Sequence, residues 1–520
     1  MDFENVAMFP ELEIQPAAQV AGYLPRSRYM PLAFLPGTLL CGLSWLFGGV
    51  PRLTDIGFVL FSLACLSLLI AEIARFPRRY GVSGIILFGG GLVWLSHDYF
   101  AHWFGSSFTD ATDMVFPASV VAKAAYFNCL FVGIMSVGLL IERGRWLQRI
   151  MMSVPEPNNP GLYFWVMIGM QCIGIGAFAL FAKGSFFLAL AHVWASPFTG
   201  LGVEWTVGRT GNLNYSWGGY VAQMLQVGQT GGVVAAVFAL LVARSTPSRI
   251  LAWIVWAFWV FFGFAGGRRG EMVFMFLPVA FLLFLKYQAQ ASAHLPRHSL
   301  RAYLTAGTVI FILLVIVQFE GTYRDTGLSN GDLSAVSLTT SQGNAMFSEG
   351  LPGWAVIPDQ QDYFYDRVPG EAALRLIPDQ IFDFFVGVIP RALWPTKPID
   401  PVWEWYNALV THDASGRVGT TVSNGLAGHW YFRYGFAGIV EGGLLMGWLL
   451  AVSERALQES AGRPMTILLS LGIMTWLFRC FRDFIYIDLY GLLIGAAAFA
   501  LLCKIANHGS APPGEVVEEY

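Results

Sequence analysis

The sequence predicts an all-α protein that crosses a membrane many times. Of its 520 residues, 55% are hydrophobic, 15% are aromatic and only 12% are charged, which is not the balance of a soluble domain. Apolar runs of about 20 residues, the length that a spanning helix requires, recur along the chain. The net charge is −3 and the basic residues are scattered, which indicates neither a nucleic-acid surface nor a polybasic lipid-binding segment.

We expect about twelve transmembrane helices. Their cores are expected at 31–49, 55–74, 83–101, 116–141, 161–182, 220–243, 250–266, 271–287, 302–319, 436–453, 465–481 and 487–504. The segment before the first core contains Asp2, Glu4, Glu11 and Glu13 and lacks the basic start of a cleavable signal. The first apolar run is therefore expected to remain as an anchor.

Arginine and lysine residues fall in alternate short connections, which predicts the orientation. They are Arg75, Arg78, Arg79, Arg143, Arg145, Arg149, Arg244, Arg249, Lys286, Arg297 and Arg301. Basic connections stay on the cytoplasmic side. Both termini are therefore expected on the cytoplasmic side of a bacterial inner membrane. The predicted organisation is a cytoplasmic segment 1–30, transmembrane helices one to nine in 31–319, a periplasmic loop 320–435, helices ten to twelve in 436–504 and a cytoplasmic tail 505–520.

The predicted periplasmic loop is far longer than a connector needs. Its roughly 115 residues are rich in Trp, Tyr and Phe, unlike a disordered segment. Within 372–390, the apolar positions 381, 384, 385 and 388 share one helical face, while Asp379 and Asp383 share another. This pattern predicts a helix that rests on the membrane surface.

Two arginines depart from the rule that basic residues lie in the cytoplasmic connections. The turn "GGRRGE", 266–271, places Arg268 and Arg269 on the predicted outer side, between two strongly apolar spans. Two interpretations stay open. Either the pair anchors the chain at lipid head groups, or it forms an anion clamp facing a cavity, in which the flanking glycines let backbone N–H groups approach a phosphate.

The stretch "VIPRALWPTKPID", 388–400, is predicted to be a stiff turn because its prolines prevent a continued helix. Arg391 and Lys397 would then be held at set positions, with Trp394 at the interface. Guanidinium groups bind phosphate oxygens and aromatic faces pack against sugar rings, so the turn suits a lipid-linked sugar phosphate. The alternative is a loop that Trp394 and Arg391 merely attach to the membrane.

These segments resemble the Wzy-type O-antigen polymerases, which join oligosaccharide repeat units. The resemblance rests on the arginine pair, on "IPRALWPTKP" (389–398) and on "SNGLAGHWYFRYGFAGIVEGGLLMGWLL" (423–450), with a weaker echo in "FRCFRDF" (478–484). In the family, an "iPR-lWP-KP" segment precedes a glycine-rich "G-GE-Y-NFG-xG" entry into the next span. This chain departs from that pattern, because His429 follows Gly428 where relatives often carry Glu, and Arg433 replaces a small amide.

The resemblance implies a GT-C-like glycosyltransferase that needs no metal or other cofactor and works on the periplasmic face. The growing glycan would pass from an undecaprenyl diphosphate donor to a lipid-linked acceptor repeat unit, making O-antigen of lipopolysaccharide or an exopolysaccharide. A chain-length regulator is a possible partner. Fixed cations would stabilise the departing diphosphate, and the candidates are Arg391, Arg268 and Arg269.

A base or hydrogen-bond acceptor is also needed for the acceptor hydroxyl. Among the outer-side candidates Glu320, Asp325, His412, Asp413, His429 and Asp483, we favour His429 and Asp483, because each lies close to an apolar span and beside a basic residue. The residues expected to bind substrate are Lys397, Arg324, Arg433, Arg482, Arg209, Trp394 and Tyr431. Arg324 could instead form a local ion pair with Asp325.

Several polar residues fall inside predicted spans and are expected to face the bundle interior. They are Lys123, His97, Asp98 and the stripe Gln223, Gln226 and Gln229. The stripe fits interhelical hydrogen bonding at least as well as substrate contact. The six cysteines lie in or beside apolar runs without metal-ligand spacing, and are expected to be small core residues.

Two other functions stay open. An O-antigen ligase would use the same donor but transfer the glycan to lipid A core, and the "IPRALWPTKP" segment favours the polymerase. A transporter or flippase would show an internal repeat and charges near the midplane. The sequence shows no convincing repeat, and its charges collect at the outer rim and in the long loop, which disfavours transport.

Overall fold

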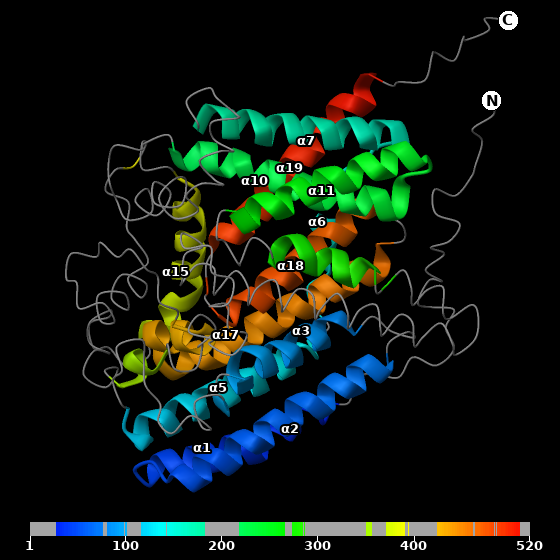
Figure 1. Cartoon of the computed structure of the whole chain (residues 1–520). Coiled ribbons are helices and arrows are strands. Elements are labelled where there is room, and N and C mark those ends of the chain that lie inside the picture. Colours follow the sequence, from blue (N-terminus) through cyan, green and yellow to red (C-terminus); the bar gives the residue numbers. More distant parts are fainter. Residues whose placement is uncertain are drawn as a thin grey trace, which may run out of the picture.

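Figure 1 shows the computed structural model of the chain. The structure describes residues 28–75, 81–97, 99–100, 116–141, 143–181, 218–265, 273–283, 285, 350–355, 371–389, 394, 424–460, 463–482, 484 and 486–509. Every regular element within these ranges is helical. The all-α class predicted from composition and hydropathy is therefore confirmed for this part of the chain.

Seven of the described helices are long and apolar enough to cross a membrane. They contain the stretches Pro51–Ile73, Ala118–Gly138, Pro160–Ala177, Met224–Val242, Thr246–Gly263, Leu426–Glu459 and Leu489–His508. Four shorter apolar helices, Met30–Leu46, Val82–Ser96, Val273–Leu283 and Pro464–Cys480, also coincide with predicted spans. The chain is thus a multi-pass helical membrane protein. The count of twelve stays a prediction, since 302–319 lies outside the described residues.

The labelled helices have the following bounds. They are α1 (Leu35–Leu46), α2 (Pro51–Arg75), α3 (Val82–Gly90), α5 (Ala118–Gly138), α6 (Arg145–Met152), α7 (Pro160–Phe181), α10 (Gly218–Val237), α11 (Thr246–Ala265), α15 (Glu371–Val388), α17 (Leu426–Glu459), α18 (Pro464–Cys480) and α19 (Tyr486–Gly509). A 3-10 turn, Met30–Phe34, precedes α1, and π-helical turns at Gly91–Ser96 and Phe238–Val242 extend α3 and α10.

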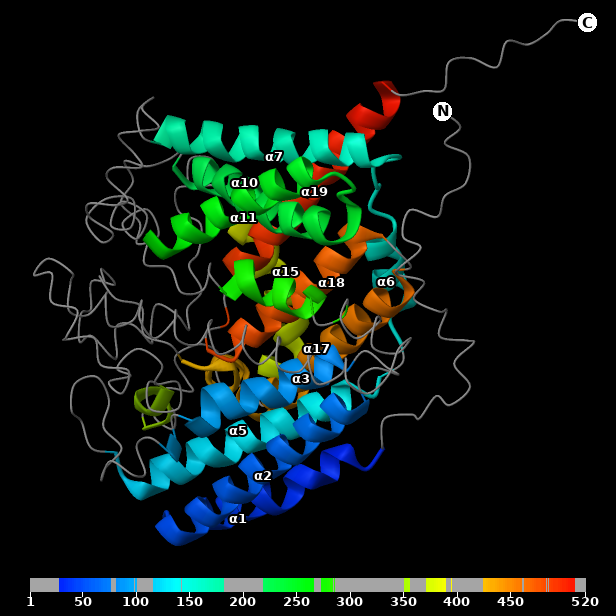
Figure 2. The ribbon, with the colours of Figure 1, turned by 45° about the vertical axis from the view of Figure 1, so that its right-hand side comes forward.

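The long helices form two groups that α17, α18 and α19 connect (Figures 1 and 2). Helices α1, α2, α3, α5 and α17 pack together, and α7, α10, α11 and α19 form the second group. Helices α5 and α17 approach closely because glycines face each other: a Cβ added at Gly447 would lie 2.0 Å from the Met135 carbonyl oxygen. Small residues allow such backbone contact between membrane helices.

The bundle has two ends, which we name by their short helices. At the α15 end, α15 runs steeply across the long helices along one edge of the bundle (Figure 1). At the α6 end, α6 connects α5 to α7 (Figure 2). Helix α17 runs from the α15 end to the α6 end, α18 returns and α19 runs back, so α19 ends where α7 begins. The membrane side that each end faces stays a prediction.

Helix α17 begins earlier than predicted. Residues 426–434, which were expected at the end of the long loop, form a buried helical segment. At Gly435 the backbone turns sharply, with φ 60° and ψ −144°, a conformation that is essentially confined to glycine. The predicted boundary at 435–436 is therefore a kink between two helical segments and not a passage from loop to helix.

Burial agrees with most predictions for the polar and cysteine residues within spans. Lys123 is buried, and five cysteines are buried, namely Cys41, Cys65, Cys129, Cys480 and Cys503. Two predictions are wrong, because Cys172 and His97 are exposed. Asp98 lies outside the described residues. In a membrane, hydropathy alone does not tell which face of a helix meets protein and which meets lipid.

Candidate functional site

Helix α15 turns its polar face toward the bundle and its apolar face outward. Ile381, Phe382 and Phe385 are 54%, 49% and 65% exposed. Gln380 is buried, and Asp383 faces α17. The predicted helix at 372–390 is therefore present, and Ile381 and Phe385 of its predicted apolar face are exposed, whereas Phe384 packs against Tyr486 and Tyr490. Its polar side contacts protein, which leaves the apolar side open to lipid or ligand.

Arg433 joins α17 to α15 through two carboxylates. Its guanidinium donates a hydrogen bond to Asp383 and lies 3.9 Å from Asp379. The arginine side chain is only 5% exposed, and a buried charge is tolerated only when it is paired. The spacing of four between Asp379 and Asp383 places both on one helical face, so the two acids can share one cation.

Three more side chains attach α15 to the neighbouring helices. The Gln380 amide donates to the Tyr434 hydroxyl at 2.9 Å and accepts from the Tyr486 hydroxyl. The Tyr490 hydroxyl donates to the Phe384 carbonyl oxygen at 2.7 Å. Because Tyr434 lies on α17 and the other two tyrosines on α19, α15 links the two helices at this end.

Aromatic rings surround His429 at the start of α17. Its ring lies 4.6 Å from the Phe484 ring, which also packs against Trp430 at 5.3 Å and Tyr486 at 5.0 Å. Trp430 is held against the second segment of α17, since a Cβ at Gly442 would lie 2.4 Å from its indole. The glycine spacing after the kink thus determines where the aromatic cluster lies.

Unsatisfied polar atoms lie beside this cluster. The Trp430 indole N–H and the Asn424 side-chain oxygen are buried, and neither has a hydrogen-bond partner in the described part of the chain. Buried polar groups are normally paired, and leaving one unpaired costs about 1–3 kcal/mol. One unused donor and one unused acceptor near the start of α17 therefore favour a bound group with hydroxyls.

A second aromatic layer brings a segment of the long loop into the bundle. Trp354 is buried, stacks on Phe127 at 5.4 Å and contacts the Tyr431 ring at 5.0 Å. Lys123 lies 5.9 Å from the Tyr431 ring and 3.5 Å from the Trp354 carbonyl oxygen. The buried cation predicted on α5 is thus stabilised by an aromatic face and a carbonyl.

The structure brings together two of the segments that carry the family resemblance, 423–450 and 478–484, and describes Ile389 and Trp394 of a third. The last turns of α15 lead into 389–398, the first segment of α17 carries His429, Tyr431 and Arg433, and Phe484 ends the third segment. The His429–Phe484 contact connects the last two segments, and the Arg433–Asp383 pair connects the first segment of α17 to α15, which precedes 389–398. Trp394, inside the first segment, lies 6.5 Å from Phe382.

The predicted site residues divide into two sets. His429, Arg433, Arg482, Trp394 and Tyr431 are described, and all lie in or beside these segments at the α15 end. Arg391, Arg268, Arg269, Asp483, Lys397, Arg324 and Arg209 lie outside the described residues. Arg482 and Phe484, on either side of Asp483, are described. The roles predicted for both sets stay predictions.

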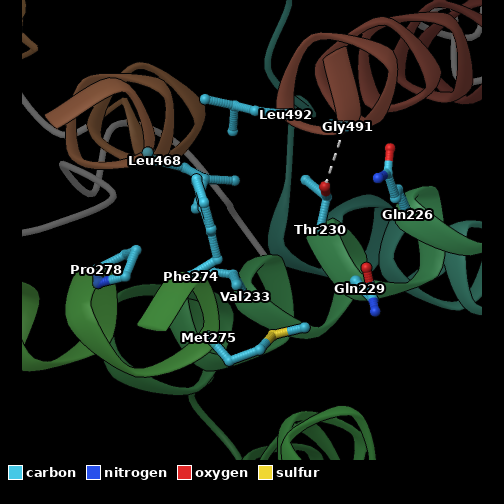
Figure 3. A pocket seen from close by; sticks show the side chains of 11 residues that line it. Gln226, Gln229, Thr230, Val233, Phe274, Met275, Pro278, Leu468, Gly491 and Leu492 are labelled. Carbon is cyan, nitrogen blue, oxygen red and sulfur yellow. Dashed lines mark hydrogen bonds between the residues drawn. The ribbon is translucent and has the colours of Figure 1, made fainter. Parts of the chain in front are cut away.

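A cavity lies beside this site, between α10, the helix 273–283, α18 and α19 (Figure 3). Gln226, Gln229 and Thr230 line one wall, and the other walls are mainly apolar. The Thr230 hydroxyl donates to the Gly491 carbonyl oxygen at 3.4 Å, while the Gln226 side-chain oxygen is buried without a partner among described residues. Gln226 and Gln229 of the glutamine stripe thus face a cavity, and both predicted roles of the stripe stay open.

Sequence reasoning missed the polar network of α15. Gln380, Tyr434, Tyr486 and Tyr490 received no role, although the four-residue spacing of the last two was visible. Among the described residues, no group of three or more His, Cys, Asp or Glu side chains could hold a metal ion.

Comparisons of the chain with protein-family models, with curated protein sequences and with solved structures find no match.

Proposed function

We propose that this protein is a membrane glycosyltransferase that polymerises lipid-linked oligosaccharide repeat units. The observation that carries the proposal is that two of the segments that resemble Wzy-type polymerases, 423–450 and 478–484, meet beside α15, the helix that leads into a third, 389–398. They are separate in sequence, yet the first segment of α17 contacts both α15 and Phe484 at one end of the bundle. A shared site is a reason for distant segments to lie together there.

The proposed reaction replaces one bond to a sugar carbon by another. The anomeric carbon of the growing glycan loses its bond to the diphosphate of undecaprenyl diphosphate, which leaves with the electron pair. A hydroxyl of the acceptor repeat unit forms the new glycosidic bond and gives its proton to a base. Cations that face the leaving diphosphate would lower the barrier by stabilising its charge.

The residues take roles that follow from their chemistry. Arg391, Arg268 and Arg269 would bind the diphosphate, and Asp483 or His429 would accept the proton. His429 is 3% exposed, so it needs the aromatic cluster to open before it meets substrate. The unused Trp430 N–H and Asn424 oxygen suit sugar hydroxyls, which both donate and accept. Arg433 is already paired with Asp383, which favours a role in holding α15.

The proposal also includes the number of membrane spans and the membrane side that each end of the bundle faces. With twelve spans and the basic connections inside, the α15 end faces the periplasm of a bacterial inner membrane, where repeat units linked to undecaprenyl diphosphate would be used. The GT-C-like fold belongs to the same proposal. A chain-length regulator would then contact the same enzyme in the membrane.

The test uses the full chain, purified and reconstituted into lipid vesicles with an undecaprenyl-diphosphate-linked repeat unit and EDTA. The expected result is a ladder of products spaced by one repeat unit. Arg391→Ala and Arg268→Ala should each abolish the ladder. Arg52→Ala is the matched control, because Arg52 is an exposed arginine at the same end, on α2, and its loss should leave the ladder intact.

Other outcomes separate the alternatives. Transfer of the glycan to added lipid A core, without a ladder, would identify a ligase. Movement of intact substrate across the vesicle, with no new glycosidic bond, would identify a transporter. A normal ladder from both Arg391→Ala and Arg268→Ala would contradict the diphosphate roles of these arginines.

A further inference from the structure

The short helix α6 presents a basic and apolar face at the opposite end of the bundle. Arg145, Trp146, Arg149 and Ile150 follow one another at helical spacing on one side, and all four are exposed. Trp146 is 61% and Ile150 is 55% exposed. The opposite side carries Gln148 and Met151, which are buried. Large apolar side chains alternate with cations on the same open surface.

This helix is held firmly in place. Gly144, with φ 120°, forms the sharp turn before it. The Arg455 guanidinium donates to the carbonyl oxygens of Ile141 and Arg143, each at 2.9 Å, and the Trp448 indole donates to the Arg143 carbonyl at 2.7 Å. Side chains of α17 therefore fix the turn, so the face of α6 keeps its orientation against the bundle.

The arginines on α6 and just before it are available to a ligand. The guanidinium groups of Arg143, Arg145 and Arg149 are exposed, and within the described residues none of the three has a hydrogen-bond or ion-pair partner. Because α6 connects two membrane-crossing helices, it lies at the level where spans leave the membrane. Tryptophan prefers this level, and arginine side chains reach from it toward phosphates.

We propose that the exposed face of α6, together with Arg143, is a binding site for anionic phospholipid head groups. The lipid phosphate would accept hydrogen bonds from the guanidinium groups, while Trp146 and Ile150 would enter the acyl-chain boundary. Three arginines are fewer than a polybasic segment contains, so charge counting along the sequence does not reveal the site. The face that Arg145 and Arg149 share with Trp146 and Ile150, with Arg143 two residues before it, does. The proposal is independent of the reaction at the α15 end.

The test measures lipid selectivity of the reconstituted full chain by electron paramagnetic resonance of spin-labelled lipids. The wild-type protein is expected to immobilise spin-labelled phosphatidylglycerol in preference to spin-labelled phosphatidylcholine. Replacing Arg143, Arg145 and Arg149 together by Gln should remove most of this preference, with at most about a fivefold contribution from each arginine. High salt should weaken it, because exposed charges are screened.

A matched control keeps the change in charge constant. Arg244, Arg249 and Lys504 are also exposed, and they lie at the same end on other elements. Their joint replacement by Gln should preserve the preference. A triple Arg→Lys variant of the α6 residues should keep most of it, and its thermal unfolding should match the wild type. Absence of a preference in the wild type, or equal losses in both Gln triples, would overturn the proposal.

Discussion

A partly buried carboxylate joins helices at each end of the bundle, but the two carboxylates are stabilised differently. At the α15 end, Asp383 accepts a hydrogen bond from Arg433. At the α6 end, one oxygen of Glu156 accepts the Met465 backbone N–H at 2.7 Å, and the other has no partner in the described part of the chain. Burial raises the pKa of Glu156 to about 7, against the Met465 hydrogen bond and the charge of Arg463.

Because of this difference, the two ends should respond differently to mutation and to pH. An ion pair holds α15 to α17, so the α15 end should be sensitive to the loss of either partner. The start of α18 at the α6 end meets a single carboxylate, whose protonation changes near neutral pH. Asn507 donates to the Glu156 carbonyl oxygen at 3.1 Å, so the same residue also reaches α19. The α15 end therefore depends on charge pairing, and the α6 end on pH.

The largest expected effect is the loss of the Arg433–Asp383 pair. Asp383→Asn should lower the free energy of unfolding by about 3 kcal/mol, because it leaves Arg433 buried without its main counter-charge. Unfolding of the purified protein in mixed micelles measures the change. Asp379→Asn is the matched control: this carboxylate is 3.9 Å from Arg433 and 26% exposed, so it should cost well under 1 kcal/mol. Equal losses would show that α15 is not held by one specific pair.

The second prediction concerns Glu156 and the pH dependence of the free energy of unfolding. Its pKa is higher in the folded protein, about 7, than its ordinary value of 4.5, so folding favours the protonated form. Stability from this group is fully present below pH 4.5, falls as the pH rises toward 7 and stays level above it. Glu156→Gln should therefore stabilise the protein at pH 8 by up to about 3 kcal/mol and change it little at pH 5.

Unfolding of wild type and Glu156→Gln across this pH range gives the difference directly. Glu459→Gln, at an exposed carboxylate near the same end, is the control and should leave the pH dependence unchanged. A Glu156→Gln variant that is less stable than wild type at pH 8 would show that the carboxylate is paired after all, and the contrast between the two ends would fail.

The apolar runs were enough to predict most of the fold. Eleven of the twelve predicted ranges coincide with described apolar helices, because the need for about 20 apolar residues acts on each helix separately. The segment 426–434 was not predicted as helix, since "LAGHWYFRY" mixes polar and aromatic residues. Its helical packing depends on the kink at Gly435 and on contact of Trp430 with Gly442, neither of which is local information.

The candidate site was predictable in place but not in its contacts. The resemblance directed attention to 389–398, 423–450 and 478–484, and described parts of the last two meet beside α15, which leads into the first. The partner of Arg433 was not predicted. Asp379 and Asp383 carried the available signal, a pair of acids spaced by four, yet a pair of acids on a helix face suits water as well as a buried cation. Only the packing of α15 against α17 decides between them.

A third prediction tests whether the α15 end depends on the kink. Gly435→Ala should lower the free energy of unfolding by about 2 kcal/mol, because a Cβ strains the backbone at φ 60° and ψ −144°. Gly176→Ala is the matched control, since a Cβ there meets nothing within 4 Å, and it should be neutral or stabilising. Thermal unfolding compares the two. No loss at Gly435 would mean that α17 can straighten without disturbing the site.

The smallest expected effect is that of a single hydroxyl, and it sharpens the account of the α15 end. The Tyr490 hydroxyl donates to the Phe384 carbonyl oxygen at 2.7 Å, and a lost hydrogen bond between neutral groups costs about 1 kcal/mol. Tyr490→Phe keeps the ring, which lies 5.3 Å from the Phe384 ring, so only the hydroxyl is removed, with its bond to Phe384 and its longer contact of 3.2 Å with the Asp383 carbonyl oxygen. Its loss in the same unfolding assay should therefore be about a third of that of Asp383→Asn. A loss as large as that of Asp383→Asn would mean that α19, and not the ion pair on α17, is the main support of α15.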